Sequence, residues 1–171
     1  MKNNKGFSLV ELIIVIAILA VVTGGSIVGF GYLYRTDVKS TVKKIDSSLL
    51  KTQSYTTSKS TGGRDVKMIL KTDGSGNYCI GYEGIEGQED VKIGKSRLAI
   101  KCYKTDGTQV TVGSNQVKIC FDRATGGLLP VDENDPNGVC WSKIEVSAGG
   151  TRTCTITISK VTGKTEVTYF Q

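Results

Sequence analysis

Hydrophobic and polar positions divide the chain into stretches of different character. Residues 12–22 contain no polar side chain, and residues 7–34 contain a single charge. Beyond residue 35 the apolar residues recur at steps of four, three and four, which places them on one helical face. These residues are Val38, Val42, Ile45 and Leu49. We therefore expect one helix from Ser8 to about Ser54, apolar in its first part and amphipathic in its second, followed by a loop over residues 54–63.

Beyond residue 64 the pattern changes to short runs rich in β-branched and aromatic residues. In the clearest run, 154–159, apolar residues alternate with threonine and serine, and turns containing glycine separate the runs. The expected strands are 66–71, 78–82, 98–103, 117–121, 144–146, 154–159 and 165–170. We expect an α+β fold in which the long N-terminal helix covers the buried face of one antiparallel sheet, whose other face is wet.

The apolar segment at the N-terminus allows three interpretations. Lys2 and Lys5 before it, with small residues after it, are typical of a secretory signal peptide. As a helix, residues 7–34 would extend roughly 42 Å at ~1.5 Å per residue, which also suits a plain membrane anchor. In the third interpretation the helix lies in the membrane only before it joins a protein assembly.

Glu11 favours the third interpretation. A carboxylate in hydrocarbon costs at least ~2.5 kcal/mol, and neither a signal peptide nor a simple anchor has a use for it. Cleavage between Gly6 and Phe7 would create a partner, the α-amine of Phe7, about one turn from Glu11 and able to meet Glu11 of a neighbouring subunit. Two opposite charges buried together lose less solvation free energy than one alone, so the pair would favour one axial register.

A resemblance to the type IV pilin family lies in the run Gly6-Phe7-Ser8-Leu9-Val10-Glu11-Leu12 and the apolar stretch after it. The family includes major and minor pilins, secretion pseudopilins and competence pilins. The resemblance implies that a prepilin peptidase cuts after Gly6 and methylates Phe7, and that Glu11 guides subunit docking. It also implies the pilin fold, with a leader (1–6), a membrane and filament-core helix (7–34) and a globular domain (35–171). That domain would comprise an amphipathic helix half (35–54) and a β-sheet domain (64–171).

On this resemblance we expect a structural subunit of a type IV pilus that supports adhesion, twitching motility or aggregation. Its implied partners are further copies in a helical filament, the prepilin peptidase and the assembly machinery in the membrane. The chain would pass once through the cytoplasmic membrane before it reaches the bacterial surface. The alternatives are a pseudopilin of a type II-like secretion system and a DNA-uptake pilin.

The chain departs from the family in the second half of this helix. Many members have a proline there, whereas this chain has Gly24, Gly25, Gly29 and Gly31. Each glycine costs ~1 kcal/mol relative to alanine in a helix. We expect residues 23–31 to unwind in the assembled filament, and small-residue packing between membrane helices is the other interpretation.

Composition adds a basic stretch and no sign of catalysis. The net charge is +6, and the basic excess concentrates between residues 35 and 64. Such a stretch could bind an acidic polymer such as nucleic acid, or lipid headgroups. The alternative is an ordinary solvated helix face. Histidine is absent, and the chain contains no nucleotide-binding or hydrolase motif. We therefore expect neither an enzyme nor a cofactor.

The five cysteines all follow the apolar segment, where export permits disulfides. Strand alternation points Cys102 and Cys154 inward and Cys120 outward. Many family members close a C-terminal loop with a disulfide, and the single pair we expect is Cys120–Cys140. Its 20-residue loop would contribute roughly 3 kcal/mol. Reduced buried cysteines and a cysteine–metal site are the alternatives.

Residues 132–137 form an acidic turn. Closely spaced oxygen ligands could hold calcium, as in the loops of secretion pseudopilins, but the spacing of an EF-hand is absent. We expect an ordinary solvated turn and no metal site.

Overall fold

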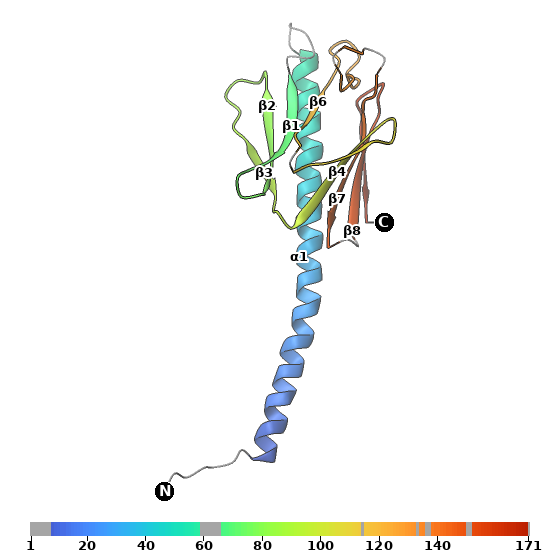
Figure 1. Ribbon diagram of the computed structural model, residues 1–171. Helices are drawn as coiled ribbons and strands as arrows, with labels where there is room; N and C mark the ends of the chain where they lie inside the picture. Colours follow the sequence, from blue (N-terminus) through green and yellow to red (C-terminus); the bar gives the residue numbers. More distant parts are fainter. Residues whose placement is uncertain are drawn as a thin grey trace. The chain divides into compact units, whose positions relative to one another are not determined.

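The computed structural model describes residues 8–58, 66–113, 115–132, 134–135, 138–149 and 152–170, with the backbone alone for residues 24–32 and 152. The chain divides into two units, Met1–Arg35 and Thr36–Gln171. In the described part, one helix, α1 (Leu9–Ser58), precedes nine strands, which gives an α+β fold (Figure 1). No helix among the described residues has an apolar stretch long enough to cross a membrane.

The second part of α1 packs one face against the strands. Its fully buried apolar residues are Val38, Val42, Ile45 and Leu49. Thr52 and Thr56 continue this face, and their hydroxyls donate to the carbonyls of Ser48 and Thr52 at 2.8 Å each. These bonds within the helix satisfy the buried hydroxyls, so a segment rich in serine and threonine stays helical to Ser58 rather than ending near Ser54. Residues 59–63 of the expected loop lie outside the described residues.

The strands form two antiparallel sheets, so the expectation of a single sheet is wrong. The four-stranded sheet has the order β3-β2-β1-β6 and the five-stranded sheet the order β5-β4-β7-β8-β9. The first comprises β1 (Lys67–Thr72), β2 (Tyr78–Glu83), β3 (Val91–Gly94) and β6 (Val117–Cys120). The second comprises β4 (Leu98–Lys104), β5 (Gln109–Thr111), β7 (Trp141–Ala148), β8 (Arg152–Ile158) and β9 (Thr165–Tyr169). The chain enters the second sheet after β3 and returns for β6, which pairs with β1. Alternation along single strands does not reveal such an exchange, because it reports faces and not partners.

The five-stranded sheet has the alternation that the sequence predicts. Ile100 and Cys102 on β4, with Cys154 and Ile156 on β8, are fully buried, and the residues between them are more exposed. The predicted inward direction of Cys102 and Cys154 is therefore confirmed. The central strands of the four-stranded sheet instead bury consecutive residues, because the segment before β3 covers part of their outer face.

Two strands, β3 and β5, were not expected. Both are short and lie at the edges of their sheets. Each has a single partner strand and only one or two apolar side chains. They are strands because they pair with β2 and β4. The pattern of their own residues does not reveal this pairing.

Side chains of α1 tie the helix to both sheets. Thr41 donates to the carbonyl of Ile93 on β3 at 2.9 Å, and Asp46 accepts from the hydroxyl of Thr165 on β9 at 2.6 Å. The amide of Gln53 donates to the carbonyls of Gly126 and Thr162 at 2.8 and 2.9 Å. These contacts fix the turns beside α1 to the helix.

One of these turns requires glycine at residue 163. Its φ is 65°, and a side chain there would collide with the carbonyl oxygen of Gly126. The Thr162–Gly163 pair thus makes the tight turn between β8 and β9 that the sequence predicts.

Candidate assembly site

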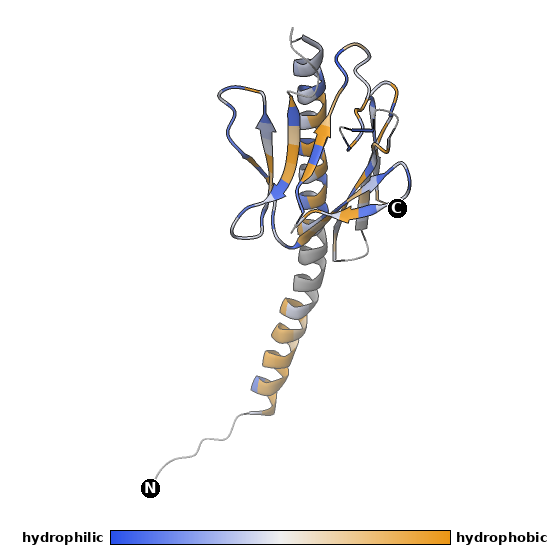
Figure 2. Cartoon of the chain, turned by 45° about the horizontal axis from the view of Figure 1, so that its top comes forward, coloured by the Kyte–Doolittle hydropathy of each residue, from blue (hydrophilic) through white to orange (hydrophobic). Residues whose placement is uncertain are grey.

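The first part of α1 presents apolar side chains all around the helix, because consecutive residues cover every face. Leu9 is 75% exposed and Val21 is 77% exposed, and the large side chains between them are about half exposed or more. Figure 2 shows the hydrophobic colours along this part of the helix. Exposed apolar surface of this extent marks a region of contact with lipid or protein.

Glu11 lies in the first turn of α1, within this apolar surface. Its neighbours Val10 and Leu12 are 62% and 57% exposed. The partial positive charge of the helix N-terminus favours a carboxylate in the first turn. When the apolar surface is covered, this carboxylate would need a cation to offset the loss of water. Gly6 and Phe7, which would supply that cation, lie outside the described residues.

The backbone of α1 runs as one helix through the four glycines at residues 24, 25, 29 and 31. Just before them, the hydroxyl of Thr23 donates to the carbonyl of Leu19 at 2.7 Å. Unwinding of residues 23–31 concerns the assembled filament and stays a prediction.

The connection between Cys120 and Cys140 folds back on itself. The carbonyl of Cys120 accepts a hydrogen bond from the amide of Leu129 at 3.0 Å. The Cys140 sulfur lies 3.8 Å from the carbonyl of Leu128. Trp141 Nε1 donates to the carbonyl of Lys118 at 2.8 Å, which holds the start of β7 beside β6. These contacts bring both cysteines to the same short segment, and the Cys120–Cys140 pair itself remains a prediction.

Cysteine thiols are buried in the second unit, residues 36–171, which we call the head, and Cys140 is fully buried there. Cys102 and Cys154 are fully buried, and Cys79 is nearly so. Burial raises the pKa of the Cys102 thiol to about 12, and burial also raises the pKa of Cys154 and Cys140. Thiols with raised pKa values are poor nucleophiles and poor metal ligands near neutral pH.

The acidic turn is organised by hydrogen bonding in its described part. Asp132 Oδ1 accepts from the amide of Asn134 at 2.9 Å. Glu133, Pro136 and Asn137 lie outside the described residues. Among the residues described, no group of three acidic, cysteine or histidine side chains could hold a metal ion.

The lysines of the predicted basic stretch have different surroundings. The ammonium of Lys39 lies 5.7 and 5.2 Å from the ring centres of Tyr169 and Phe170. Lys44 donates to the carbonyl of Lys92 at 3.1 Å, and Lys51 lies 4.9 Å from the ring of Tyr82. Part of this stretch therefore packs on the head, while Lys43 is exposed.

A model of the prokaryotic N-terminal methylation motif matches residues 1–27. These residues carry a prepilin-type motif. Type IV pilins and pseudopilins share it, so the resemblance seen at residues 6–12 is confirmed. The prepilin motif implies processing by a prepilin peptidase and assembly into a pilus or pseudopilus. Neither the curated proteins nor the solved structures compared with the chain give a match.

Proposed function

We propose that this chain is a structural subunit of a type IV pilus, without catalytic activity. A prepilin peptidase cuts after Gly6 and methylates the new N-terminus at Phe7. Residues 7–34 hold the subunit in the cytoplasmic membrane before assembly and form the filament core afterwards. The head, from residue 36 onward, takes the pilin fold and faces the surroundings of the bacterium.

The observation that carries the proposal is the prepilin motif directly before an exposed apolar helix that contains one carboxylate. The apolar residues explain association, since their burial removes about 25 cal/mol of free energy for each Å² taken from water. They do not by themselves choose one register, because an apolar surface accepts many offsets. Glu11 supplies the choice, because its carboxylate is stabilised only where the α-amine of a neighbouring Phe7 meets it.

A pseudopilin of a secretion system is the second candidate, because it has the same motif and the same type of helix. The two functions differ in where the filament ends. A pilus extends from the cell, whereas a pseudopilus stays within the envelope. Location therefore separates them better than any feature of the head.

The test is mass spectrometry of the chain in filaments sheared from intact cells. We expect a chain that starts at N-methylated Phe7 and is abundant in the sheared fraction. Correct processing with retention in the envelope fraction would assign the pseudopilin function instead. A chain that starts near Ser26, or still at Met1, would contradict both.

A further inference from the structure

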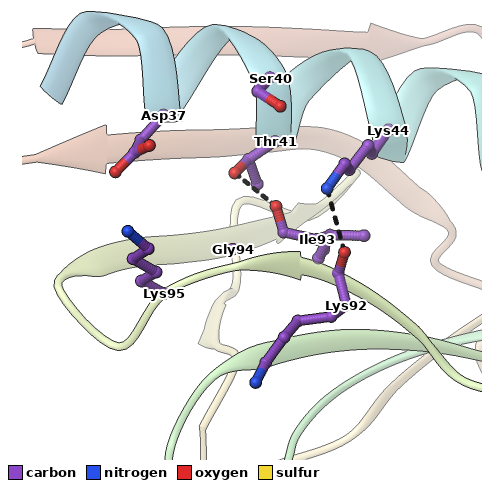
Figure 3. Close-up of a pocket in the computed structure, with 8 residues that line it drawn as sticks. All are labelled: Asp37, Ser40, Thr41, Lys44, Lys92, Ile93, Gly94 and Lys95. Atoms are coloured by element: carbon purple, nitrogen blue, oxygen red, sulfur yellow. Dashed lines mark hydrogen bonds between the residues drawn. The ribbon is translucent and has the colours of Figure 1, made fainter. Parts of the chain in front are cut away.

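Two neighbouring hollows along α1 are lined by lysines. The first, of about 350 Å³, is lined by Ser40, Lys44 and Lys95, among others. The second, of about 430 Å³, is lined by Ser40, Lys43 and Lys44, among others. The two hollows share the lining residues Ser40 and Lys44, so they are direct neighbours along α1. We call Lys43, Lys44 and Lys95 the lysine groove, and Figure 3 shows the part that contains Lys44 and Lys95.

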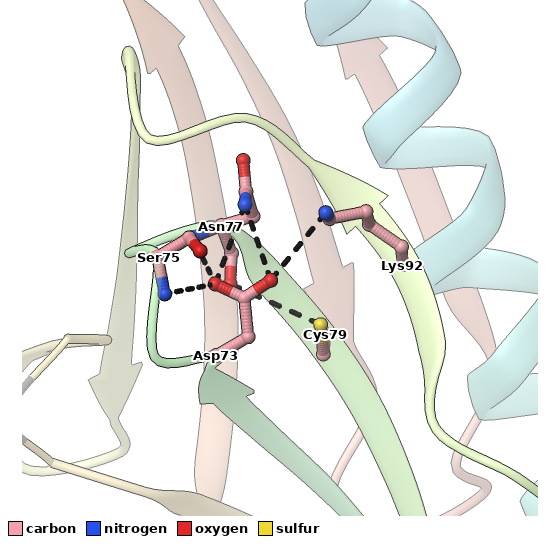
Figure 4. Close-up of polar contacts among 5 residues, drawn as sticks. All are labelled: Asp73, Ser75, Asn77, Cys79 and Lys92. Atoms are coloured by element: carbon pink, nitrogen blue, oxygen red, sulfur yellow. Dashed lines mark hydrogen bonds and ion pairs between the residues drawn. The ribbon is translucent and has the colours of Figure 1, made fainter.

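The other charges beside this groove already have partners. Arg97 forms an ion pair with Asp37. Lys92 lies 3.4 Å from a carboxylate oxygen of Asp73 (Figure 4), and hydrogen bonds from Asn77 lower the pKa of this carboxyl. In contrast, the described residues provide no carboxylate partner within ion-pair distance for the three lysines of the groove. Among the described residues, the groove therefore holds three ammonium groups without an ion-pair partner, because Asp37, which also lines the first hollow, pairs with Arg97.

The opposite charge lies on residues 83–90, which we call the acidic loop. This segment contains four acidic residues and neither lysine nor arginine. Lys118 pairs with Glu83 at 3.2 Å and Lys71 pairs with Asp90 at 2.7 Å. Glu86 and Glu89 are exposed, and within the described part of the chain they have no ion-pair partner. Two free carboxylates therefore project from this loop.

The acidic loop is held firmly enough to act as a docking element. Ile85 is only 7% exposed, and it anchors the start of the loop in the head. Asp90 lies against Gly81, and a side chain at residue 81 would come within 2.7 Å of the carboxylate oxygen of Asp90. Lys51 of α1 also contacts Gln88. An anchored loop loses little conformational entropy on binding, so its charges are presented ready for a partner.

The loop and the groove adjoin at Val91, which follows the loop and lines the second hollow, but their centres lie at different heights along α1. The loop contacts the helix at Lys51, and the groove is centred near Lys44, about seven residues or roughly 10 Å nearer the N-terminus. Within one chain the two sets of charges are therefore offset along the helix. A second, parallel copy displaced by about that distance would bring its acidic loop level with the lysine groove of the first.

We propose that the acidic loop of one subunit docks into the lysine groove of the next, with Glu86 and Glu89 facing Lys43, Lys44 and Lys95. This inference rests on the proposed filament function and names the contact between heads within it. Each subunit gives its loop to one neighbour and its groove to another. Such a head-to-tail contact does not close on itself and so propagates as a filament. The charges favour this offset of the neighbour, since it brings the opposite charges together.

The first test is cross-linking of cells that express the full chain with a carbodiimide. This reagent joins a lysine amine to a carboxylate with loss of water, and only where the two are in direct contact. We expect a covalent dimer whose digest contains Lys43 or Lys95 joined to Glu86 or Glu89. The N-terminus of the same sample is sequenced by mass spectrometry.

The second test is a charge exchange. Lys43→Glu with Lys95→Glu should lower the yield of this dimer about fivefold or more, and Glu86→Lys with Glu89→Lys should do the same, as expected for a few exposed ion pairs. Combining all four changes should restore the yield, because the pairs are re-formed with opposite sign. The matched control, Lys160→Glu with Lys164→Glu, makes the same change of net charge on an exposed turn and should leave the yield unchanged.

The outcomes separate the contact from the function. Dimers joined elsewhere, or no dimers, in cells whose chain starts at N-methylated Phe7 would overturn the contact and leave the filament function intact. Four changes that fail to restore the dimer, together with salt-sensitive retention of the wild type on heparin, would assign the groove to an anionic polymer and overturn the contact. A chain that still starts at Met1 would overturn the proposed function, and the contact with it.

Discussion

The two parts of α1 are built from the same secondary structure and use apolar residues in opposite ways. Between Leu9 and Val22 the apolar side chains are exposed, and the described residues of their own unit do not cover them. Between Val38 and Leu49 they are fully buried against the sheets of the head. The second part therefore stabilises the fold of one chain. The first part contributes little to that fold, and its apolar surface is left for other molecules.

The largest expected effect comes from breaking the first part without touching the second. Glu11→Gln removes the charge and keeps the size of the side chain. If the carboxylate neutralises a buried amine, its loss costs ~3–5 kcal/mol for each contact, so sheared filament should fall by at least about tenfold. Immunoblots of the sheared fraction measure the yield. The N-terminal mass and the unfolding midpoint of the head should stay as in the wild type.

The matched control for this change is Glu166→Gln, at an exposed glutamate on β9. It should leave the yield of filament unchanged. Wild-type yield with Glu11→Gln would show that this carboxylate does not set the register.

The next largest effect is expected from a substitution that disrupts the packing of the second part of α1 and leaves the first part unchanged. Leu49→Ala empties a fully buried site and should lower the free energy of unfolding by ~2–5 kcal/mol. The adjacent Leu50 is 48% exposed, so Leu50→Ala should change the free energy of unfolding by less than about 0.5 kcal/mol. Urea unfolding followed by the fluorescence of Trp141, the single tryptophan, measures both. Equal losses at the two positions would contradict the assigned buried face.

A third prediction concerns the stability of the head away from α1. If Cys120 and Cys140 are joined, reduction should lower the free energy of unfolding by roughly 3 kcal/mol, because a 20-residue loop is released. Mass spectrometry without reductant should find the two peptides linked. A double variant with alanine at both positions should be insensitive to reductant. Two free thiols at these positions in the exported wild type would contradict the predicted disulfide.

The smallest effect is a dependence on pH at the alkaline end. The pKa of the buried Cys102 is raised to about 12 from an ordinary value of 9.0. Above pH 9 the unfolded chain therefore loses this proton and the folded chain keeps it. The free energy of unfolding should fall by about 1 kcal/mol between pH 9 and pH 10 from this group. In Cys102→Ala the free energy of unfolding should fall less between pH 9 and pH 10, by the contribution of this thiol. The same pH dependence in the variant and the wild type would contradict the prediction.

Local patterns were sufficient where a residue's surroundings repeat along the chain. The steps of four and three on α1 located its buried face, and alternation located the inward cysteines Cys102 and Cys154. The prepilin motif was also readable, because it depends on consecutive residues. Pairing over long distances was not readable: β1 joins β6 across some fifty residues, which separates two sheets where one was expected.

The charged surfaces of the head could not be predicted from the sequence either. The basic stretch was evident, but its lysines divide between aromatic contacts, a carbonyl and a groove that β3 completes. The signal for the acidic loop was present, since residues 83–90 contain four acidic residues without a basic one. Its meaning depends on Lys71 and Lys118 neutralising the two end residues, which only the fold reveals.

The position of α1 beside β3 bears on how such a subunit avoids misassembly. β3 is an edge strand, and edge strands readily pair with strands of other chains and aggregate. Here the carbonyls of Lys92 and Ile93 accept hydrogen bonds from Lys44 and Thr41 of the helix. A crowded pool of subunits would thus have fewer open backbone groups for strand exchange. The helix that joins subunits in order also protects them from joining in the wrong way.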